Sequence, residues 1–261
     1  MWNRVGALLL RHFYLYRRSL ARAMEIFFWP VMELLLWGFL TVYLRRLEVP
    51  VTVLFLIGAV IFWDVLYRSQ QAITLSITEE IWVRNILNLF IAPVRIGEIL
   101  LATCLVGVVK ALVTALVLGT IAYVLYAFNL LAIGPALVPF LLVLLLFGWA
   151  VGMCTMGLIL RYGQAAEALI WGVPFLLQPV SAVFYPVDVL PRWLQVIAWL
   201  LPSTYAFEGM RAALDSGRVD LRDLAFALVL NLVYLAAGAA FFGWMLRQVR
   251  EKGYLSRLGM E

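Results

Sequence analysis

The sequence predicts an all-α, polytopic membrane protein, and two observations carry this prediction. Hydrophobic residues make up 65% of the 261 residues, charged residues make up only 13%, and the mean hydropathy is +0.99. A soluble globule of this size could not bury so much apolar surface. Six apolar runs also approach the ~20 residues that a helix needs to cross ~30 Å of hydrocarbon. We expect one domain, residues 1–261, because the chain shows no internal repeat or low-complexity tract.

Residues 1–22 form an amphipathic segment ahead of the first apolar run. Helical spacing collects its apolar side chains on one face and its arginines on the opposite face, which predicts an interfacial helix rather than a span. An arginine stripe could also bind RNA, but the broad aromatic face favours lipid headgroups, so we expect a lipid partner and no nucleic acid. The apolar face comprises Trp2, Val5, Leu9, Phe13, Tyr16 and Leu20, and the cationic face comprises Arg4, Arg11, Arg18 and Arg22.

Six transmembrane helices are expected from hydropathy, five within residues 26–184 and the sixth within residues 224–246. The hydropathy of the second span falls at the polar residues 68–71, which we interpret as a turn. Gly148 and Gly152 form a G-x-x-x-G pattern in the fourth span and allow a close helix approach, either within the chain or between two chains. The six spans are Ile26 to Leu44, Val51 to Leu75, Ile99 to Ala127, Gly134 to Leu160, Ala165 to Phe184 and Leu224 to Leu246.

The segment 185–223, between the last two spans, is apolar in its first half, but Pro186, Pro191 and Pro202 divide it into pieces too short to cross a membrane. We favour a re-entrant helical hairpin, because prolines at both ends of an apolar helix define a unit. The alternative is an interfacial loop that belt aromatics hold at the surface. Those aromatics are Trp193 and Trp199.

Basic residues near the span ends divide unequally between the two sides of the membrane. Twelve fall on one side and six on the other, so the positive-inside rule places both termini, including the tail 247–261, in the cytoplasm. The larger set is Arg4, Arg11, Arg17, Arg18, Arg22, Arg84, Arg95, Arg161, Arg247, Arg250, Lys252 and Arg257, and the smaller set is Arg45, Arg46, Arg192, Arg211, Arg218 and Arg222.

Three ionisable residues, Glu33, Asp64 and Lys110, fall well inside the expected spans. The helical rise places both acids ~10 Å and the lysine ~16 Å from the cytoplasmic edge. An unpaired charge at such a depth costs several kcal/mol, so we expect Lys110 to pair with Glu33 or Asp64 and to tie the third span to the first or second. The functional alternative is a proton or substrate pathway through these residues.

Thr78 to Glu98 is a charged, amide-bearing island between two apolar runs. One stripe within it follows helical i, i+4, i+7 spacing, and Pro93 ends the expected helix. This stripe could contact one of two surfaces, the membrane surface or a groove in a partner protein. The stripe is Trp82, Ile86 and Leu89, and the polar residues beside it are Arg84, Asn85 and Asn88.

The residues needed for catalysis are missing from the sequence. With one histidine, and with Cys104 and Cys154 inside apolar runs, no zinc motif, metal cluster or catalytic triad is present. Neither lysine, Lys110 or Lys252, belongs to a G-x-x-x-x-G-K-[ST] phosphate loop. We therefore expect no enzyme activity, no metal and no cofactor on this chain, and active transport would need a partner chain or an ion gradient.

The order of these parts resembles the permease subunit of a type-2 ABC exporter, and the resemblance covers almost the whole chain. Its most specific marks are the run EEIWVRNILNLFIAPVRIGE at residues 79–98 and the run FYPVDVLPRWLQVIAWLLP at residues 184–202. The family implies a bacterial or archaeal plasma (inner) membrane, a second permease copy that is identical or paralogous, and a separate cytoplasmic ABC ATPase that binds ATP and Mg²⁺.

In that family the 78–98 helix would be the coupling helix, seated in a groove of the ATPase. The resemblance implies this role for the charged, amide and tryptophan side chains of the island, and it names no substrate-binding residue. The expected coupling residues are Glu79, Glu80, Trp82, Arg84, Asn85, Asn88 and Glu98.

The leading hypothesis is therefore a subunit of an ATP-driven exporter that moves a drug, lipid or glycan-type substrate out of the cytoplasm. The first alternative is an ion-coupled secondary transporter or channel that uses the three intramembrane charges. The second is a membrane enzyme of lipid metabolism, because the segment 185–223 carries four charges near the outer interface. We interpret these as solvated loop charges, with one surface pair a helical turn apart. They are Asp188, Glu208, Arg211 and Asp215.

Overall fold

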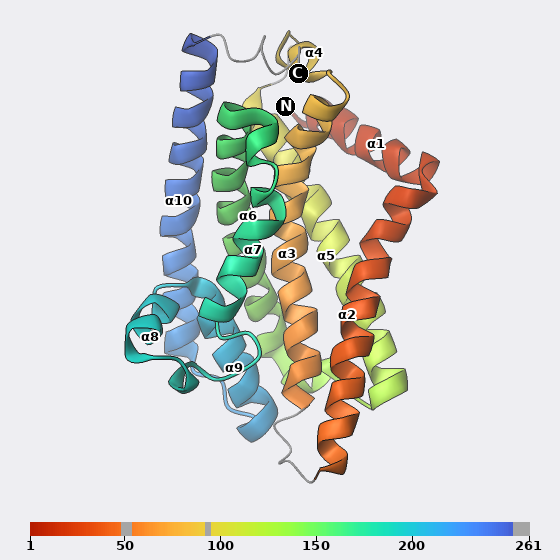
Figure 1. Cartoon of the computed structure of the whole chain (residues 1–261), viewed down its shortest axis with the longest axis vertical. Helices are drawn as coiled ribbons and strands as arrows, with labels where there is room; N and C mark the ends of the chain where they lie inside the picture. Colours follow the sequence, from red (N-terminus) through yellow and green to blue (C-terminus); the bar gives the residue numbers. More distant parts are fainter. Residues whose placement is uncertain (48–53, 92–94, 253–261) are drawn as a thin grey trace.

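The computed structural model describes residues 1–47, 54–91 and 95–252, and these residues form helices joined by turns, with no strand among them (Figure 1). The described side chains exclude those of residues 21–23, 54, 87, 89 and 90. The expected start of the second span at Val51, the helix-ending Pro93 and the basic Arg257 therefore lie outside the described residues, as does the Leu89 side chain.

The helices form one bundle in which α2, α3, α5 and α6 run in alternating directions and α10 runs parallel to α6 (Figure 1). Short helices occupy the turns between them. In chain order the elements are α1 (Trp2–Arg18), α2 (Leu20–Arg46), α3 (Leu54–Trp82), α4 (Ile86–Ile91), α5 (Ile96–Tyr126), η2 (Leu130–Ala136), α6 (Leu137–Tyr162), η3 (Gly163–Ala166), α7 (Leu169–Val180), η4 (Val187–Val189), α8 (Arg192–Trp199), α9 (Pro202–Ser216) and α10 (Leu221–Glu251).

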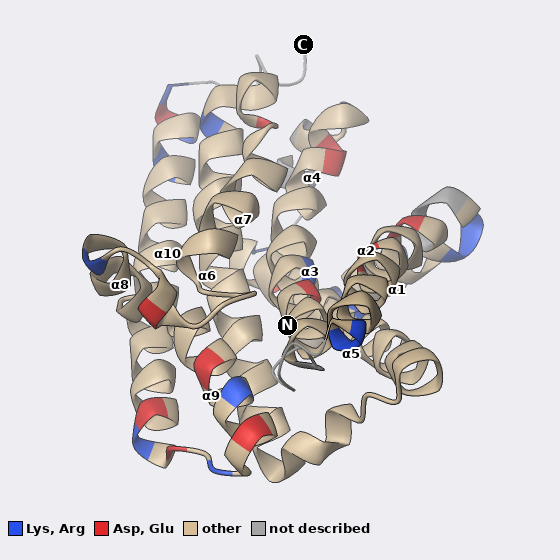
Figure 2. Ribbon diagram, turned by 60° about the horizontal axis from the view of Figure 1, so that its bottom comes forward, with Lys and Arg blue, Asp and Glu red and all other residues tan. Residues whose placement is uncertain are grey.

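The bundle has two distinct ends, and we name each after a helix (Figure 1). The α4 end holds the start of α1, α4, the turn between α6 and α7 and the last turns of α10. The α8 end holds α8, α9, the end of α2 and the turn between α5 and α6. Figure 2 shows that most of the ribbon between these ends carries neither acidic nor basic residues. Apart from Arg257, which lies outside the described residues, the two sets of basic residues from the sequence thus belong to elements at opposite ends of the bundle.

Four helical stretches are long and apolar enough to cross a membrane: 24–46, 96–126, 130–166 and 221–251. They correspond to the first, third, fourth and sixth expected spans. The fifth expected span contains α7, which has only 12 residues. Twelve residues rise ~18 Å, less than the ~30 Å of a hydrocarbon core. The second expected span corresponds to α3, which is long enough at 29 residues but carries a polar middle.

α3 forms the centre of the bundle, packed against α2, α5, α6 and α7. The expected turn at residues 68–71 is wrong, because α3 continues through them and ends only at Trp82. Ser69 and Gln70 are fully buried, and Gln70 Nε2 donates to Thr74 Oγ1 at 3.1 Å. A helix surrounded by protein can carry such side chains because its neighbours, rather than lipid, accept their hydrogen bonds.

The Gly148 and Gly152 pair of α6 faces α3 within the same chain. A Cβ atom at Gly148 would lie 1.8 Å from Ser69 Oγ, and one at Gly152 would lie 2.8 Å from the carbonyl oxygen of Gln70. No side chain fits into such spaces, so the absence of Cβ is what allows the two backbones to approach. Of the two uses open to this motif, the structure shows the one within the chain.

The segment before α10 forms two helices joined by a tight turn, α8 and α9, at the α8 end (Figure 1). Pro191 precedes α8, and Pro202 occupies the first turn of α9, where a missing N–H costs no hydrogen bond. α9 packs against α3, α6 and α10, and its Phe207 and Met210 are fully buried. α8 lies outside them, with Trp193 and Val196 each 66% exposed.

Candidate functional site

The island between α3 and α5 consists of a helix end, a turn and a short second helix. α3 ends at Trp82, Arg84 adopts a left-handed conformation with φ 54°, and the six-residue α4 follows. The single helical stripe predicted across Trp82 and Ile86 is therefore wrong, because the turn separates them. Ile86 is fully buried, whereas Trp82 is 46% exposed. Sequence spacing could not reveal this break, since the turn contains neither glycine nor proline.

Glu80 joins the island to the amphipathic helix α1. Its side chain is only 4% exposed and forms an ion pair with Arg11 of α1. The other carboxylate oxygen of Glu80 accepts a hydrogen bond from Asn85 Nδ2 at 2.6 Å, and Asn85 Oδ1 accepts one from Asn88 at 2.9 Å. Hydrogen bonds to a charged group are stronger than neutral ones. Glu80 therefore fixes both the turn and α1.

Glu98 makes the same kind of connection at the start of α5. Its carboxylate accepts the backbone N–H of Arg95 at 2.8 Å, and together the two residues cap the first turn of the helix. Arg4 of α1 lies 3.6 Å from the same carboxylate oxygen. Two arginines that we expected to face lipid headgroups thus bind carboxylates of α3 and α5 instead. They keep α1 against the α4 end.

The exposed side chains that the structure describes on the island include three large apolar ones, beside the polar Arg84, Asn88 and Arg95. Trp82, Val83 and Ile91 are 46%, 62% and 81% exposed, and Arg84 and Asn88 are exposed beside them. The indole Nε1 of Trp82 donates to Glu167 Oε1, in the turn between α6 and α7, at 2.6 Å. Because Trp82 is held in this way, the exposed surface is fixed in place before any partner binds.

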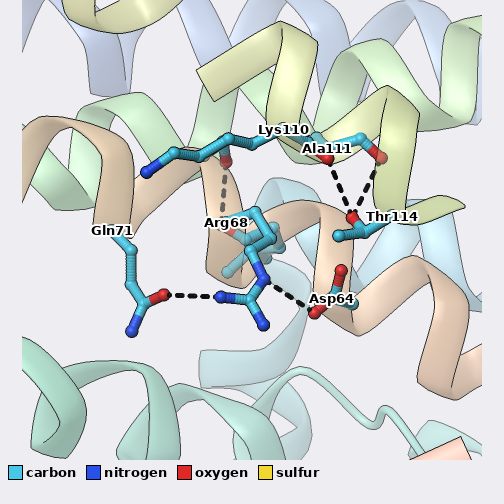
Figure 3. Close-up of polar contacts among 8 residues, drawn as sticks. Asp64, Arg68, Gln71, Lys110, Ala111 and Thr114 are labelled. Atoms are coloured by element: carbon cyan, nitrogen blue, oxygen red, sulfur yellow. Dashed lines mark hydrogen bonds and ion pairs between the residues drawn. The ribbon is translucent and has the colours of Figure 1, made fainter. Parts of the chain in front are cut away.

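The intramembrane charges are arranged differently from the prediction. Asp64 forms its ion pair with Arg68, one turn along α3, with Asp64 Oδ1 and Arg68 Nε 3.1 Å apart. Both side chains are buried, and Arg68 also donates to Gln71 at 3.2 Å. Figure 3 shows the guanidinium between these two acceptors, with Thr114 of α5 beside Asp64. The predicted pairing of Lys110 with an acid is therefore wrong for Asp64.

Lys110 reaches α1 instead of the acids. Its ammonium group donates to the hydroxyl of Tyr16 and lies 4.5 Å from the centre of that ring. Figure 3 shows its side chain pointing away from Asp64. Glu33 of α2 interacts electrostatically with Asp64 and Arg68. Glu33 and Asp64 thus lie within electrostatic range of each other and share Arg68 as a nearby cation, while Lys110 on α5 is a third attachment point for α1.

The four charged residues singled out in the segment 185–223, Asp188, Glu208, Arg211 and Asp215, are not all solvated loop charges. Glu208 and Arg211 pair at 2.7 Å, and the Arg211 side chain is only 10% exposed. Arg211 also donates to the backbone carbonyls of Ala182 and Val183, and Glu208 accepts the backbone N–H of Val187 at 2.8 Å. These contacts tie α9 to the loop before α8. They account for both residues by loop structure, without a catalytic role.

For several residues of these sites, no nearby pattern in the sequence indicates the interaction partner. Arg4, Arg11 and Tyr16 find their partners on α3 and α5, far along the chain, and the same is true of Glu167. Arg68 is the exception, because its i, i+4 spacing from Asp64 is visible in the sequence. The turn expected at residue 68 concealed this pair, because a turn would have separated the two side chains.

Together, the long apolar helices and the buried charges between them define a multi-pass membrane protein. The family model of the ABC-2 type transporter matches residues 4–214. The chain belongs to this family of transport permeases, whose members are membrane components of ABC transporters and associate with an ABC ATPase. A comparison with curated proteins gives no match.

Proposed function

We propose that this chain is the membrane-spanning subunit of an ATP-driven exporter, and that its α4 end is cytoplasmic and binds a separate ABC ATPase. The observation that supports this most directly is the exposed apolar surface of Trp82, Val83 and Ile91. An exposed apolar patch at the end of a membrane bundle is typical of a protein interface. The family match and the missing phosphate loop both point to an ATPase on another chain.

The contacts of α1 offer a route by which ATP-driven movement reaches the spans. A push on the island would act on α3 directly, because Trp82 ends that helix. It would also act on α1 through Arg11 and on the start of α5 through Glu98 and Arg4. Three elements would then move as a unit. Binding free energy at one end can change the packing of the spans only through such rigid connections.

The test is co-purification with a candidate ABC ATPase subunit co-expressed with this chain, using two matched variants. Val83→Glu places a charge in the proposed interface, at a side chain that is 62% exposed. Val196→Glu makes the same change at the α8 end, where the side chain is 66% exposed. A charge buried in an interface without a partner costs several kcal/mol, so we expect Val83→Glu to weaken the complex by at least about tenfold.

We expect Val196→Glu to bind the ATPase as the wild type does. Equal binding by both variants would contradict the assignment of the α4 end as the docking surface. Transport that persists after ATP depletion and stops when the proton gradient is dissipated would instead support the secondary-transporter alternative.

We also propose that a second permease copy, identical or paralogous, completes the transporter in a bacterial or archaeal inner membrane. The α7 helix is too short to cross alone, and α2 exposes a row of large side chains that includes Phe28, Leu36 and Phe39. Lipid or a second permease could cover this row. Chemical crosslinking in membranes separates the two, because only a second copy gives a dimer band.

A further inference from the structure

A cavity of about 550 Å³ lies between α2, α3 and α7. Its size falls in the range of pockets that hold small molecules, ~300–1,000 Å³. Each of the three helices contributes two aromatic side chains to its lining. These are Trp29 and Trp37 of α2, Trp63 and Tyr67 of α3, and Trp171 and Phe175 of α7.

The same cavity has a charged wall. Glu25 and Glu33 of α2 line it, together with Arg68 and Gln71 of α3. Arg68 already forms an ion pair with Asp64, which is buried behind it. With Asp64 included, three carboxylates and one guanidinium lie on or directly behind this wall, so the wall has an excess of acid. Lipid is a poor occupant for such a wall, because a charge that faces hydrocarbon costs several kcal/mol.

Aromatic faces and a carboxylate together favour one class of ligand. The face of an indole ring carries negative potential, so a cation within ~6 Å of its centre is attracted. A nearby carboxylate adds a direct charge partner, while the remaining ring surface binds an apolar body. An anion would meet the excess acid, and a neutral apolar molecule would leave the carboxylate without a partner.

We propose that this cavity binds an organic cation with a bulky apolar body, with Glu33 as the charge partner and the surrounding rings as the cation-binding faces. This inference rests on the proposed function and deepens it, because the cavity becomes the substrate site of the exporter and organic cations become its substrate class.

The test uses two probes of the same shape and opposite charge, tetraphenylphosphonium and tetraphenylborate. Both are titrated by calorimetry into the purified full-length chain in detergent micelles, with protein-free micelles subtracted. The variant Glu33→Gln removes the charge and keeps the shape. Glu251→Gln makes the same change at an exposed residue at the far end of α10 and serves as the matched control.

We expect the wild type and Glu251→Gln to bind the phosphonium equally, and Glu33→Gln to bind it about tenfold more weakly or worse. Glu33→Gln should not weaken the binding of tetraphenylborate in the same way. Because each probe is compared with itself between variants, its partitioning into micelles cancels.

The proposal is overturned if the wild type does not bind the phosphonium. It is also overturned if Glu33→Gln weakens the binding of both probes alike, or of neither probe. Co-purification of Glu33→Gln with the ATPase shows that this variant is folded. If it does not fold, the wild type alone decides: phosphonium binding beyond the partitioning into protein-free micelles supports the site, and its absence overturns the proposal. A wild type that shows no phosphonium binding but still forms the ATPase complex refutes the substrate class and leaves the proposed function standing.

Discussion

At the scale of single residues, the ion pair between Asp64 and Arg68 is the most consequential feature in the middle of α3. Each partner is buried, so neither charge is solvated when the other is removed. Breaking a buried pair costs much more than replacing both partners with apolar residues, because the remaining charge has no compensation. Glu33 raises the cost of removing Arg68 alone, since it places a second acid near the same guanidinium.

We predict that Arg68→Met destabilises the protein by roughly 3–5 kcal/mol, because it leaves two acids without their cation. The double variant Arg68→Met/Asp64→Leu should regain most of that loss. The measurement is the unfolding midpoint in mixed micelles of increasing denaturing detergent, for the wild type, both single variants and the double variant. Additive losses in the double variant would show that the two side chains do not act as a pair.

The acidic residues of the island show a second feature at this scale. Glu80 and Glu98 were predicted to contact a partner ATPase, and the structure shows them bound to Arg11 and Arg4 of α1. Carboxylates already held in this way are less available to a partner protein than the neighbouring exposed residues. The proposed docking surface therefore shifts toward Trp82, Val83 and Ile91.

At the scale of helices, the packing of α6 on α3 depends on glycine. Gly148 and Gly152 lie where any Cβ atom would overlap α3, whereas a Cβ atom at Gly243 of α10 would meet no neighbouring atom within 4 Å. All three glycines are inside helices, so their intrinsic helix propensities are alike. The difference between them is therefore one of packing alone.

We predict opposite outcomes for the same substitution at two of these positions. Gly148→Ala should destabilise the protein by about 1–3 kcal/mol, because the new methyl group forces α6 and α3 apart. Gly243→Ala should be neutral or should stabilise by up to about 1 kcal/mol, because alanine is the better helix former. Unfolding in mixed micelles measures both, and equal effects would show that the close approach of α6 and α3 contributes nothing.

At the scale of the whole molecule, the bundle separates two chemically different ends. The α4 end carries the proposed docking surface and the attachment points of α1, and the α8 end carries the paired helices α8 and α9. If the α4 end is cytoplasmic, as the count of basic residues predicts, a reagent that cannot cross the membrane reaches only the α8 end in intact cells.

We predict this pattern for single cysteines at two exposed positions, Asn88→Cys at the α4 end and Arg218→Cys at the α8 end. A membrane-impermeant maleimide should label the second in intact cells and the first only after permeabilisation. The protein without an added cysteine measures any background from Cys104 and Cys154, which are partly buried. The reverse labelling would invert the orientation and remove the α4 end as an ATPase site.

The sequence by itself determined that this chain is an α-helical membrane protein, and it located four of its long apolar helices within a few residues. A helix that crosses lipid must be a long apolar run, so composition and hydropathy are enough to find it. The sequence also marked residues 78–98 as a polar segment between two apolar runs. These properties depend on neighbours along the chain.

Only the tertiary structure decided which charges meet. Glu80, Glu98 and Lys110 each have a partner on α1, and no local pattern specifies a contact between residues so far apart in sequence. The tertiary structure also decided that residues 68–71 form a helix, because a polar run surrounded by α5, α6 and α7 has protein partners for its hydrogen bonds. A rule based on hydropathy assumes lipid around each span, and α3 is surrounded by protein.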